Sequence, residues 1–331
     1  MAFFISGFFT LLLAELYRRH ALKAGIIDTP NHRSSHTQPT PRGGGLAIVI
    51  SHGLLIAYAV FTELLTAPIA TALICGSGIV AITGFIDDYR SLSSRSRFCL
   101  HFAASLVALY LLPSLPTLPL GPLELKISGL GIIVCAIGLT WLINLYNFMD
   151  GIDGIATIEA VSVLVGASAI LINHDYNAEV LLLLTAPLLG FLVLNKPPAK
   201  LFMGDGCSGY LGMAIGLLAL ITSSSGAINL WSWAILLAVF ITDSSWTLIT
   251  RILTGQAWQQ AHRSHSYQIL SRRLQSHGKV SSGVAAINLF WLTPLAWLAS
   301  TEPNFAILLA LLAYLPLGIL CAKQKAGLNN G

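Results

Sequence analysis

The sequence predicts an all-α integral membrane protein, a polytopic bundle of about 11 transmembrane helices. The prediction follows from the composition, the length of the apolar segments and the placement of the basic residues. Of the 331 residues, 55% are hydrophobic and only 10% are charged, whereas about a quarter of the residues in soluble domains are charged. This composition excludes an ordinary soluble domain.

Eleven segments are apolar and long enough to cross a bilayer, whose hydrocarbon core of about 30 Å takes about 20 residues of helix. The predicted spans are residues 2–17, 44–61, 68–86, 98–112, 129–145, 155–172, 178–194, 206–222, 230–249, 283–300 and 304–322. The first span has no basic flank and no small-residue cleavage site, so we expect a retained helix and not a signal peptide. Without repeats or a separate soluble segment, residues 1–331 are expected to form a single polytopic domain.

Successive loops between these spans lie on opposite sides of the membrane, and the basic residues are concentrated in the loops of one side. Seventeen of the 18 Lys and Arg residues fall on one side of the membrane, and Lys126 alone falls on the other. The seventeen are Arg18, Arg19, Lys23, Arg33, Arg42, Arg90, Arg95, Arg97, Lys196, Lys200, Arg251, Arg263, Arg272, Arg273, Lys279, Lys323 and Lys325. Because short loops rich in Lys and Arg stay in the cytosol, we expect a periplasmic amino terminus and a cytosolic carboxyl terminus. The net charge of +4 then reflects topology and anionic lipid headgroups, and no nucleic-acid partner is expected.

Aspartates gather at the cytosolic ends of the spans, where ionisable groups are costly and are therefore functional candidates. Asp87 and Asp88 follow the third span. Adjacent carboxylates repel each other unless a metal or a basic group compensates, and Arg90, Arg95 and Arg97 come next in the sequence. The pair is either part of a site or a solvated helix end.

A second polar group follows the fifth span at a spacing of three residues. It comprises Asn144, Asn147, Asp150 and Asp153. On a helix this spacing keeps near neighbours on one face, and Gly151 and Gly154 let the backbone turn or approach a ligand. Carboxylate and amide oxygens are the ligands that Mg²⁺ prefers. A helix cap and turn would explain only one or two of these residues.

A third candidate is Asp205, which two glycines flank at the start of the eighth span, after Lys196 and Lys200. Aspartate is a good N-cap residue, so a cap of the eighth helix is the alternative to a role in a site.

The loop after the ninth span is basic and is the fourth candidate. It carries Arg251, His262, Arg263, His265, Arg272 and Arg273. A His-x-x-His pair without a neighbouring carboxylate is a poor zinc pattern. Arginine, however, offers a two-pronged donor to phosphate oxygens, so a role in binding a pyrophosphate fits better. A plain basic cytosolic loop is the alternative.

These segments, in this order, resemble the polyprenyl-phosphate N-acetylhexosamine-1-phosphate transferases of glycosyltransferase family 4. The matching segments are Asp28-Thr-Pro-Asn-His-Arg33, Pro39-Thr-Pro-Arg-Gly-Gly-Gly45, Asp87-Asp88, Asn144 to Gly154, Phe202-Met-Gly-Asp205 and the His-bearing basic loop. The resemblance implies transfer of a sugar 1-phosphate from a UDP-sugar to undecaprenyl phosphate, with release of UMP. It also implies a Mg²⁺ site, with Mn²⁺ as an alternative metal, at the cytosolic side of the bacterial inner membrane. The active site would lie in cytosolic loops 18–43, 87–97, 146–154, 195–205 and 250–282.

The resemblance implies a role for each matching residue. Asp205 and Asn147 are expected to bind the metal, and Asp87 or Asp88 to activate the lipid phosphate. The residues expected to bind the nucleotide sugar are Asn144, Asp150, Asp153 and Phe202, of which Asp153 and Phe202 would hold the uracil. The residues expected to bind phosphate are Arg97, His262, Arg263 and His265. A homodimer is left open.

One departure from the family bears on the sugar. Many relatives have a histidine cluster where this chain reads Arg263-Ser-His265-Ser-Tyr267-Gln268. The segment is more similar to the branch that starts O-antigen units of lipopolysaccharide or other surface polysaccharides than to the peptidoglycan branch. The sugar is left open among N-acetylglucosamine, N-acetylfucosamine and N-acetylquinovosamine.

Two alternatives come from other classes. An ion-coupled transporter could use Asp243, which lies within the ninth span and is otherwise expected to bond to Thr242, Ser244 or Ser245 or to support the site. A transporter predicts repeats and polar residues at the midplane, whereas the aspartates here lie mainly at one interface. A CDP-alcohol phosphotransferase has similar Asp-Gly pairs, but Thr157 stands where that family has arginine.

Overall fold

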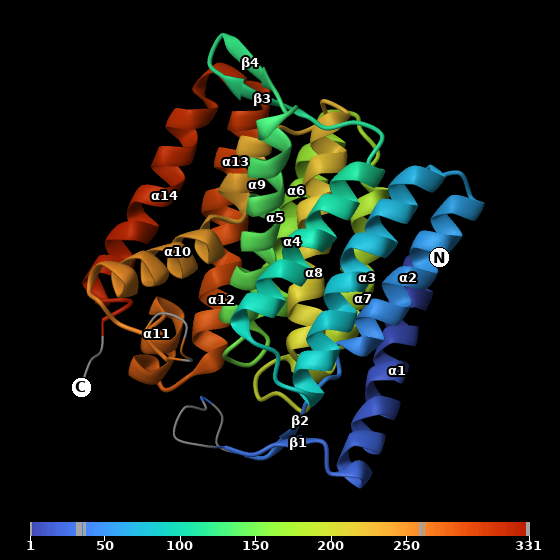
Figure 1. The fold of residues 1–331 in the computed structure, drawn as a ribbon, viewed down its shortest axis with the longest axis vertical. Coiled ribbons are helices and arrows are strands. Elements are labelled where there is room, and N and C mark those ends of the chain that lie inside the picture. The colour runs from blue at the N-terminus through green and yellow to red at the C-terminus, as the bar shows by residue number, and fades with distance from the viewer. Residues whose placement is uncertain (1, 31–34, 36–37, 258–259, 261, 329–331) are drawn as a thin grey trace.

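The structure is a computed structural model that describes residues 2–30, 35, 38–257, 260 and 262–328, and it forms a helical bundle with two small sheets (Figure 1). The helices are α1 (Ala2–Ala24), α2 (Leu46–Phe61), α3 (Ala67–Tyr89), α4 (Ser94–Leu111), α5 (Leu130–Met149), α6 (Ile155–Asn173), α7 (Glu179–Asn195), α8 (Asp205–Ser224), α9 (Leu230–Leu236), α10 (Ala238–Leu253), α11 (Ser266–Leu274), α12 (His277–Ile287), a π-helix (Asn288–Leu292), α13 (Thr293–Thr301), a 3₁₀ turn (Pro303–Phe305) and α14 (Ala306–Lys323). The strands are β1 (Ile27–Asp28), β2 (Thr40–Pro41), β3 (Thr117–Leu120) and β4 (Leu123–Lys126). Asn31, His32 and Arg33 of the amino-terminal motif lie outside the described residues.

Each predicted span coincides with a helical segment. Within the residues that the structure describes, six segments are long and apolar enough to cross a membrane, namely α3, α5, α6, α8, residues 277–301 and residues 303–323. The bent pair α9 and α10 would make a seventh. The helices α2 and α7 are apolar but shorter, with 16 and 17 residues. The chain is therefore an all-α integral membrane protein, while the count of eleven spans stays a prediction.

The ninth predicted span, 230–249, is not one continuous helix. Two helices, α9 and α10, meet there at an angle of 75°. They pack against different neighbours, because α9 contacts α13 whereas α10 contacts α5 and α11, and both contact α14. The bend turns α10 outward from the bundle, beside α14 and above α11 (Figure 1).

Helix α8 lies in the middle of the bundle and is almost entirely buried. Two glycines allow its close neighbours to approach it. A Cβ on Gly84 of α3 would lie 2.5 Å from the Cα of Gly206, and one on Gly212 would lie 2.5 Å from the carbonyl oxygen of Leu142 in α5. Small residues at such crossings let helix backbones pack closely in membranes. The packing therefore brings the ends of α3 and α5 to the start of α8.

The two small sheets lie at opposite ends of the bundle (Figure 1). The hairpin of β3 and β4 is at one end, whereas the antiparallel pair β1 and β2 and helix α11 are at the other. The aspartate-bearing ends of α3 and α5 and the start of α8 are also at the second end. The polar chemistry of the chain is thus gathered at one end of the bundle.

Candidate active site

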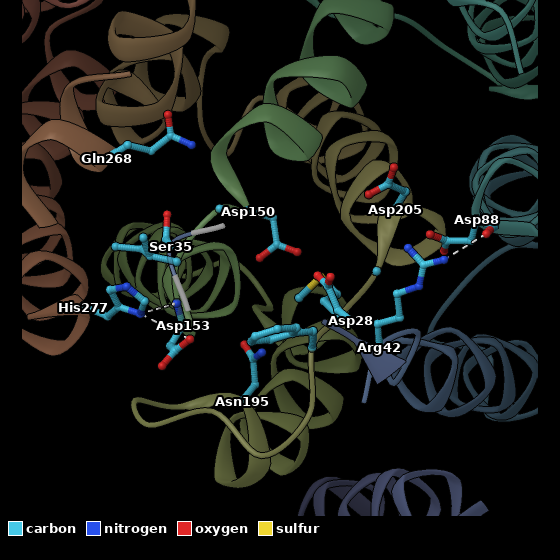
Figure 2. Close-up of a pocket in the computed structure, with 15 residues that line it drawn as sticks. Asp28, Ser35, Arg42, Asp88, Asp150, Asp153, Asn195, Asp205, Gln268 and His277 are labelled. Carbon is cyan, nitrogen blue, oxygen red and sulfur yellow. Dashed lines mark hydrogen bonds and ion pairs between the residues drawn. The ribbon is translucent and has the colours of Figure 1, made fainter. Parts of the chain in front are cut away.

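A cavity of about 300 Å³ opens at this end of the bundle. Five aspartates line it, namely Asp28, Asp88, Asp150, Asp153 and Asp205. Figure 2 shows Asp88 and Asp205 beside Arg42 on one side, Asp150 near the centre, and Asp153 with His277 on the other side. Among the described residues, Arg42 and His277 are the only basic side chains in the lining. Carboxylates therefore outnumber basic groups in the cavity.

Each aspartate comes from the end of an element. Asp88 is in the last turn of α3, Asp150 follows the last residue of α5, and Asp205 is the first residue of α8. The turn between α5 and α6 ends at Gly154, whose φ of 71° favours glycine. This turn packs on the loop after α7, where the Ala199 amide donates to Asp153 Oδ2 at 3.1 Å.

The structure distinguishes the adjacent pair Asp87 and Asp88. Arg97 donates to Asp87 Oδ2 at 2.8 Å, and the amide of Leu92 donates to Asp87 Oδ1 at 2.6 Å. These bonds turn Asp87 toward the start of α4, while Asp88 lines the cavity. The catalytic roles predicted for the two stay predictions, but only Asp88 borders the cavity.

We expect the Asp87 and Arg97 pair to stabilise the junction of α3 and α4. Asp87→Asn and Arg97→Gln should each lower the free energy of unfolding by about 1–3 kcal/mol, the range for a charge-assisted hydrogen bond. Thermal unfolding of the detergent-purified protein would measure both. Because the two groups share one interaction, the double variant should lose less than the sum of the single losses, and strictly additive losses would contradict the pairing.

The predicted metal ligands lie side by side. Asn147 hydrogen-bonds to the carboxylate of Asp205 and also donates to Ser208 Oγ at 3.2 Å. Asn144 instead donates to the carbonyl of Thr140 at 2.6 Å, one turn back in α5, and does not line the cavity. The alternative reading of Asp205 as an N-cap is wrong, because Gly204 holds that position and Asp205 begins the helix.

The charge of the cavity fits a divalent cation. Desolvation raises the pKa of Asp150 well above its usual range, and the carboxylates of Asp205 and Asp153 raise it further. Burial is the larger cause of this rise, and the two neighbouring carboxylates add a repulsion that a bound cation would relieve. In the described part of the chain, no three His, Cys, Asp or Glu side chains form a ready-made metal cluster. Mg²⁺ is typically held by one or two carboxylates together with substrate phosphates, and Asp205 offers such a carboxylate in the lining. Asn147, the other predicted ligand, does not line the cavity within the described residues.

Asp153 is fixed from two sides. His277 Nδ1 lies 3.2 Å from Asp153 Oδ1 and accepts from the Asp153 amide at 3.3 Å. Ser281, one turn further along α12, donates to the Asp153 carbonyl at 3.1 Å. Phe202 also lines the cavity, and its amide donates to the carbonyl of Pro41 at 2.8 Å. Both residues expected to hold the uracil thus border the cavity in well-supported backbone.

The basic loop lies elsewhere. None of the predicted phosphate-binding residues Arg97, His262, Arg263 and His265 lines the cavity in the part of the chain that the structure describes. His265 is buried at the N-terminus of α11, and its ring stacks on that of His262 with centroids 5.0 Å apart. Burial, together with the neighbours His265 and Arg251, lowers the pKa of His262 to about 4, so this ring is neutral at physiological pH. Phosphate binding by these residues stays a prediction.

Asp243 holds α11 in place. Its carboxylate accepts from the amides of Ser266 and Tyr267, both at 2.8 Å, and from Thr247 Oγ1 at 3.2 Å. The expected partners Thr242, Ser244 and Ser245 are therefore not the ones observed. Tyr267 in turn donates through its hydroxyl to the carbonyl of Phe148 at 2.9 Å. Asp243 thus supports the end of α5, two residues before Asp150, through α11.

Six polar residues that line the cavity in the described structure were not among the predicted site residues. They are Asp28, Ser35, Arg42, Asn195, Gln268 and His277. Asp28 and Arg42 lie in the matching amino-terminal segments, so the sequence offered a signal for them. Asn195 and His277 are single polar residues at helix ends, where only the three-dimensional packing reveals that they meet the aspartates.

Comparison with known proteins identifies the family of the chain. Residues 70–223, which include four of the five aspartates, match the model of the family described as Glycosyl transferase family 4. A probable undecaprenyl-phosphate N-acetylglucosaminyl 1-phosphate transferase of Bacillus subtilis (strain 168) is 30% identical over 287 residues, which cover 84% of this chain and 78% of that protein.

Two further relatives are more distant or shorter in overlap. A decaprenyl-phosphate N-acetylglucosaminephosphotransferase of Mycolicibacterium smegmatis is 30% identical over 63% of this chain and 56% of its own length. A phospho-N-acetylmuramoyl-pentapeptide-transferase of Prochlorococcus marinus is 28% identical over 72% of this chain and 68% of its own. The family model covers four of the five aspartates of the cavity, and the relative from Bacillus subtilis matches most of both chains. This chain therefore belongs to glycosyl transferase family 4, the polyprenyl-phosphate N-acetylhexosamine-1-phosphate transferases.

Proposed function

We propose that this protein transfers an N-acetylhexosamine 1-phosphate from a UDP-sugar to undecaprenyl phosphate and releases UMP. The observation that carries the proposal is the convergence of Asp88, Asp150 and Asp205 from three helices on one cavity at one end of a membrane bundle. The proposal is for the first sugar of O-antigen or another surface polysaccharide, with N-acetylglucosamine, N-acetylfucosamine or N-acetylquinovosamine as the sugar.

In the proposed reaction, an oxygen of the lipid phosphate bonds to the phosphorus that carries the sugar. The bond from this phosphorus to the bridging oxygen of the diphosphate breaks, and UMP leaves with that oxygen. Asp88, which borders the cavity, is proposed to orient the lipid phosphate and take up its proton. Asp153 and Phe202 are proposed to hold the base at the other side of the cavity, and Asp150 to contact the nucleotide sugar between them.

Asp205, with Asn147 beside it, is proposed to hold Mg²⁺ or Mn²⁺. The cation would offset the repulsion between two anionic substrates and the charge that builds on the departing UMP. The chain's own part is to fix Asp205 at the start of α8, where Asn147 restrains its carboxylate.

The proposed topology has eleven spans, a periplasmic amino terminus, a cytosolic carboxyl terminus and a cavity that faces the cytosol of the bacterial inner membrane. The Lys and Arg distribution supports it. The position of α11, with its basic residues Arg272 and Arg273, at the end opposite the β3 and β4 hairpin also supports it (Figure 1).

This topology predicts opposite labelling of two exposed positions. In a background without the exposed Cys99, a cysteine at Gln275 after α11 should resist a membrane-impermeant maleimide in intact cells. A cysteine at Glu124, which is exposed in the hairpin, should be labelled. Both should react once the membrane is permeabilised. Labelling of Gln275→Cys in intact cells would overturn the orientation.

The proposed reaction is tested by offering membranes that contain the protein a panel of labelled UDP-N-acetylhexosamines together with undecaprenyl phosphate, with and without Mg²⁺. A lipid product that needs both the metal and one particular donor would establish the reaction and name the sugar. If no donor gives product and no UMP-dependent exchange occurs, the proposed reaction is wrong and an ion-coupled transporter becomes the better interpretation.

A further inference from the structure

Arg42 is the arginine that lines the cavity in the described part of the chain, and its partners differ from those of the ion-paired arginines. Arg18 and Arg19 pair with Glu15, and Arg97 pairs with Asp87. Within the described residues, the hydrogen bond of the Arg42 side chain goes instead to a main-chain carbonyl, that of Asp88, at 3.2 Å from Nη2. The guanidinium therefore borders the cavity without an ion pair in the described structure, although its charge favours the ionised forms of Asp88 and Asp205 nearby.

The backbone around Arg42 is firmly held, although it lies outside the helices. Its carbonyl accepts from the Tyr17 hydroxyl at 3.0 Å. The adjacent chain pairs with the segment before Asp205, because Phe202 donates to Pro41 at 2.8 Å and Gly44 donates to Phe202 at 2.9 Å. The segment from Pro41 to Gly45 is thus tied to the residues that lead into α8.

The glycines beside Arg42 explain how this segment fits. A Cβ on Gly44 would collide with the side chain of Leu201, and one on Gly45 would collide with Cys207. No larger residue fits at either position without displacing the start of α8. The result is a long, exposed cationic side chain. Its backbone is held in place, and its guanidinium lies beside Asp88, with Asp205 nearby (Figure 2).

Charge balance points to the partner of this side chain. Both proposed substrates carry phosphate, yet the cavity is lined by five aspartates, and the histidines and arginines of the loop before α11 lie outside it. A guanidinium presents two parallel donors that match two oxygens of one phosphate group. We propose that Arg42 binds a phosphate group of a substrate, either the diphosphate of the nucleotide sugar or the phosphate of the lipid. This inference rests on the proposed function and adds a binding residue to it.

The alternative is that Arg42 only fastens the end of α3 through the Asp88 carbonyl. Cations near the last carbonyls of a helix stabilise it. The two roles predict different effects of replacing Arg42. If the side chain only stabilises the end of α3, its loss lowers thermal stability, whereas if it binds phosphate, its loss weakens substrate binding in a protein of normal stability.

The test compares Arg42→Ala, Arg42→Lys and the control Arg90→Ala with the wild type. Arg90 is an exposed arginine two residues from Asp88 that does not line the cavity, so its variant makes the same change of charge nearby. The measurements are the KM for the active UDP-sugar, the KM for undecaprenyl phosphate, the affinities for UMP and for uridine, and the thermal midpoint.

Arg42→Ala should raise one KM about tenfold or more, Arg42→Lys should raise it less, and Arg90→Ala should leave both KM values within about twofold. A higher KM for the UDP-sugar, together with weaker binding of UMP but not of uridine, would assign the nucleotide phosphate. A higher KM for undecaprenyl phosphate alone would assign the lipid phosphate.

If both KM values and UMP binding match those of Arg90→Ala, the inference is wrong, whether or not the thermal midpoint falls. Wild-type protein that neither transfers sugar phosphate nor binds UMP would overturn the proposed function, and this inference with it.

Discussion

Asp205→Asn is expected to abolish sugar-phosphate transfer, with a loss of about 10³-fold or more, while the protein still folds and inserts. The substitution keeps the shape of the side chain and its capacity to bond to Asn147. It removes the negative charge that the proposed metal requires, because an amide oxygen binds Mg²⁺ far less strongly than a carboxylate does. Transfer from the active UDP-sugar, measured in membranes over a range of Mg²⁺ concentrations, gives the loss.

A second measurement on the same variant does not depend on activity. Mg²⁺ should raise the thermal midpoint of the wild-type protein, because a ligand that binds only the native state stabilises it. The rise should disappear in Asp205→Asn. Asp175→Asn is a matched control, since Asp175 lies outside the cavity with a φ of 61°, a conformation that asparagine tolerates. An active, Mg²⁺-dependent Asp205→Asn would remove the metal assignment.

The sequence predicted the helices well because apolar length is a local property. The predicted span 155–172 is α6, Ile155–Asn173, and the span 178–194 is α7, Glu179–Asn195, each within one residue at both ends. The bend between α9 and α10 could not be predicted in the same way. The chain there reads Leu236-Leu237-Ala238, with no proline or glycine to mark a break, so the bend depends on what each half packs against.

The site was predictable where residues of one type recur near helix ends. Asp88, Asp150, Asp153, Phe202 and Asp205 were predicted as site residues, and all five line the cavity. Their chemical roles stay predictions. The sequence could not distinguish Asp87 from Asp88, because only the packing of α3 decides that Asp88 faces the cavity while Asp87 meets Arg97 and the Leu92 amide.

The basic residues were harder to place than the acidic ones. A loop rich in Arg and His is expected on the cytosolic side for topological reasons alone, so its charge does not indicate which residues reach a cavity. In the structure, His265 helps to begin α11 and Asp243 binds the first amides of that helix. Arg42 and His277, which stand apart in the sequence, are the basic residues that border the cavity.

One buried acid was missed altogether. Glu159 lies in α6 with no exposed surface, and Asn288, at the start of the π-helix, donates to its carboxyl group at 2.5 Å. An acid within a predicted span was a signal that the sequence contained. The pair joins α6 to the π-helix away from the cavity, so it bears on packing within the bundle and not on the proposed chemistry.

Gly84→Ala is expected to damage the site from a distance, without changing any residue that lines it. A Cβ at this position would lie 2.5 Å from the Cα of Gly206 and 2.8 Å from the carbonyl oxygen of Asp205. Both contacts are with backbone, so α3 and α8 must move apart by about 1 Å to reach ordinary van der Waals contact. Asp88 lies in the last turn of α3 and Asp205 is the first residue of α8, so both would be displaced, and a misplacement of that size costs about 10²-fold in rate. Overpacking should also lower the free energy of unfolding by about 1–3 kcal/mol.

Gly78→Ala, in the same helix, is the matched control. A Cβ at Gly78 meets no atom within 4 Å, so this variant should keep wild-type transfer and wild-type or slightly higher stability, since alanine favours helix over glycine. Transfer assays and thermal unfolding of both variants separate a local effect on the crossing of α3 and α8 from a general effect of adding a methyl group to α3. If Gly84→Ala transfers sugar phosphate as fast as Gly78→Ala, the rate does not depend on the distance between Asp88 and Asp205. The roles proposed for these two residues must then be revised.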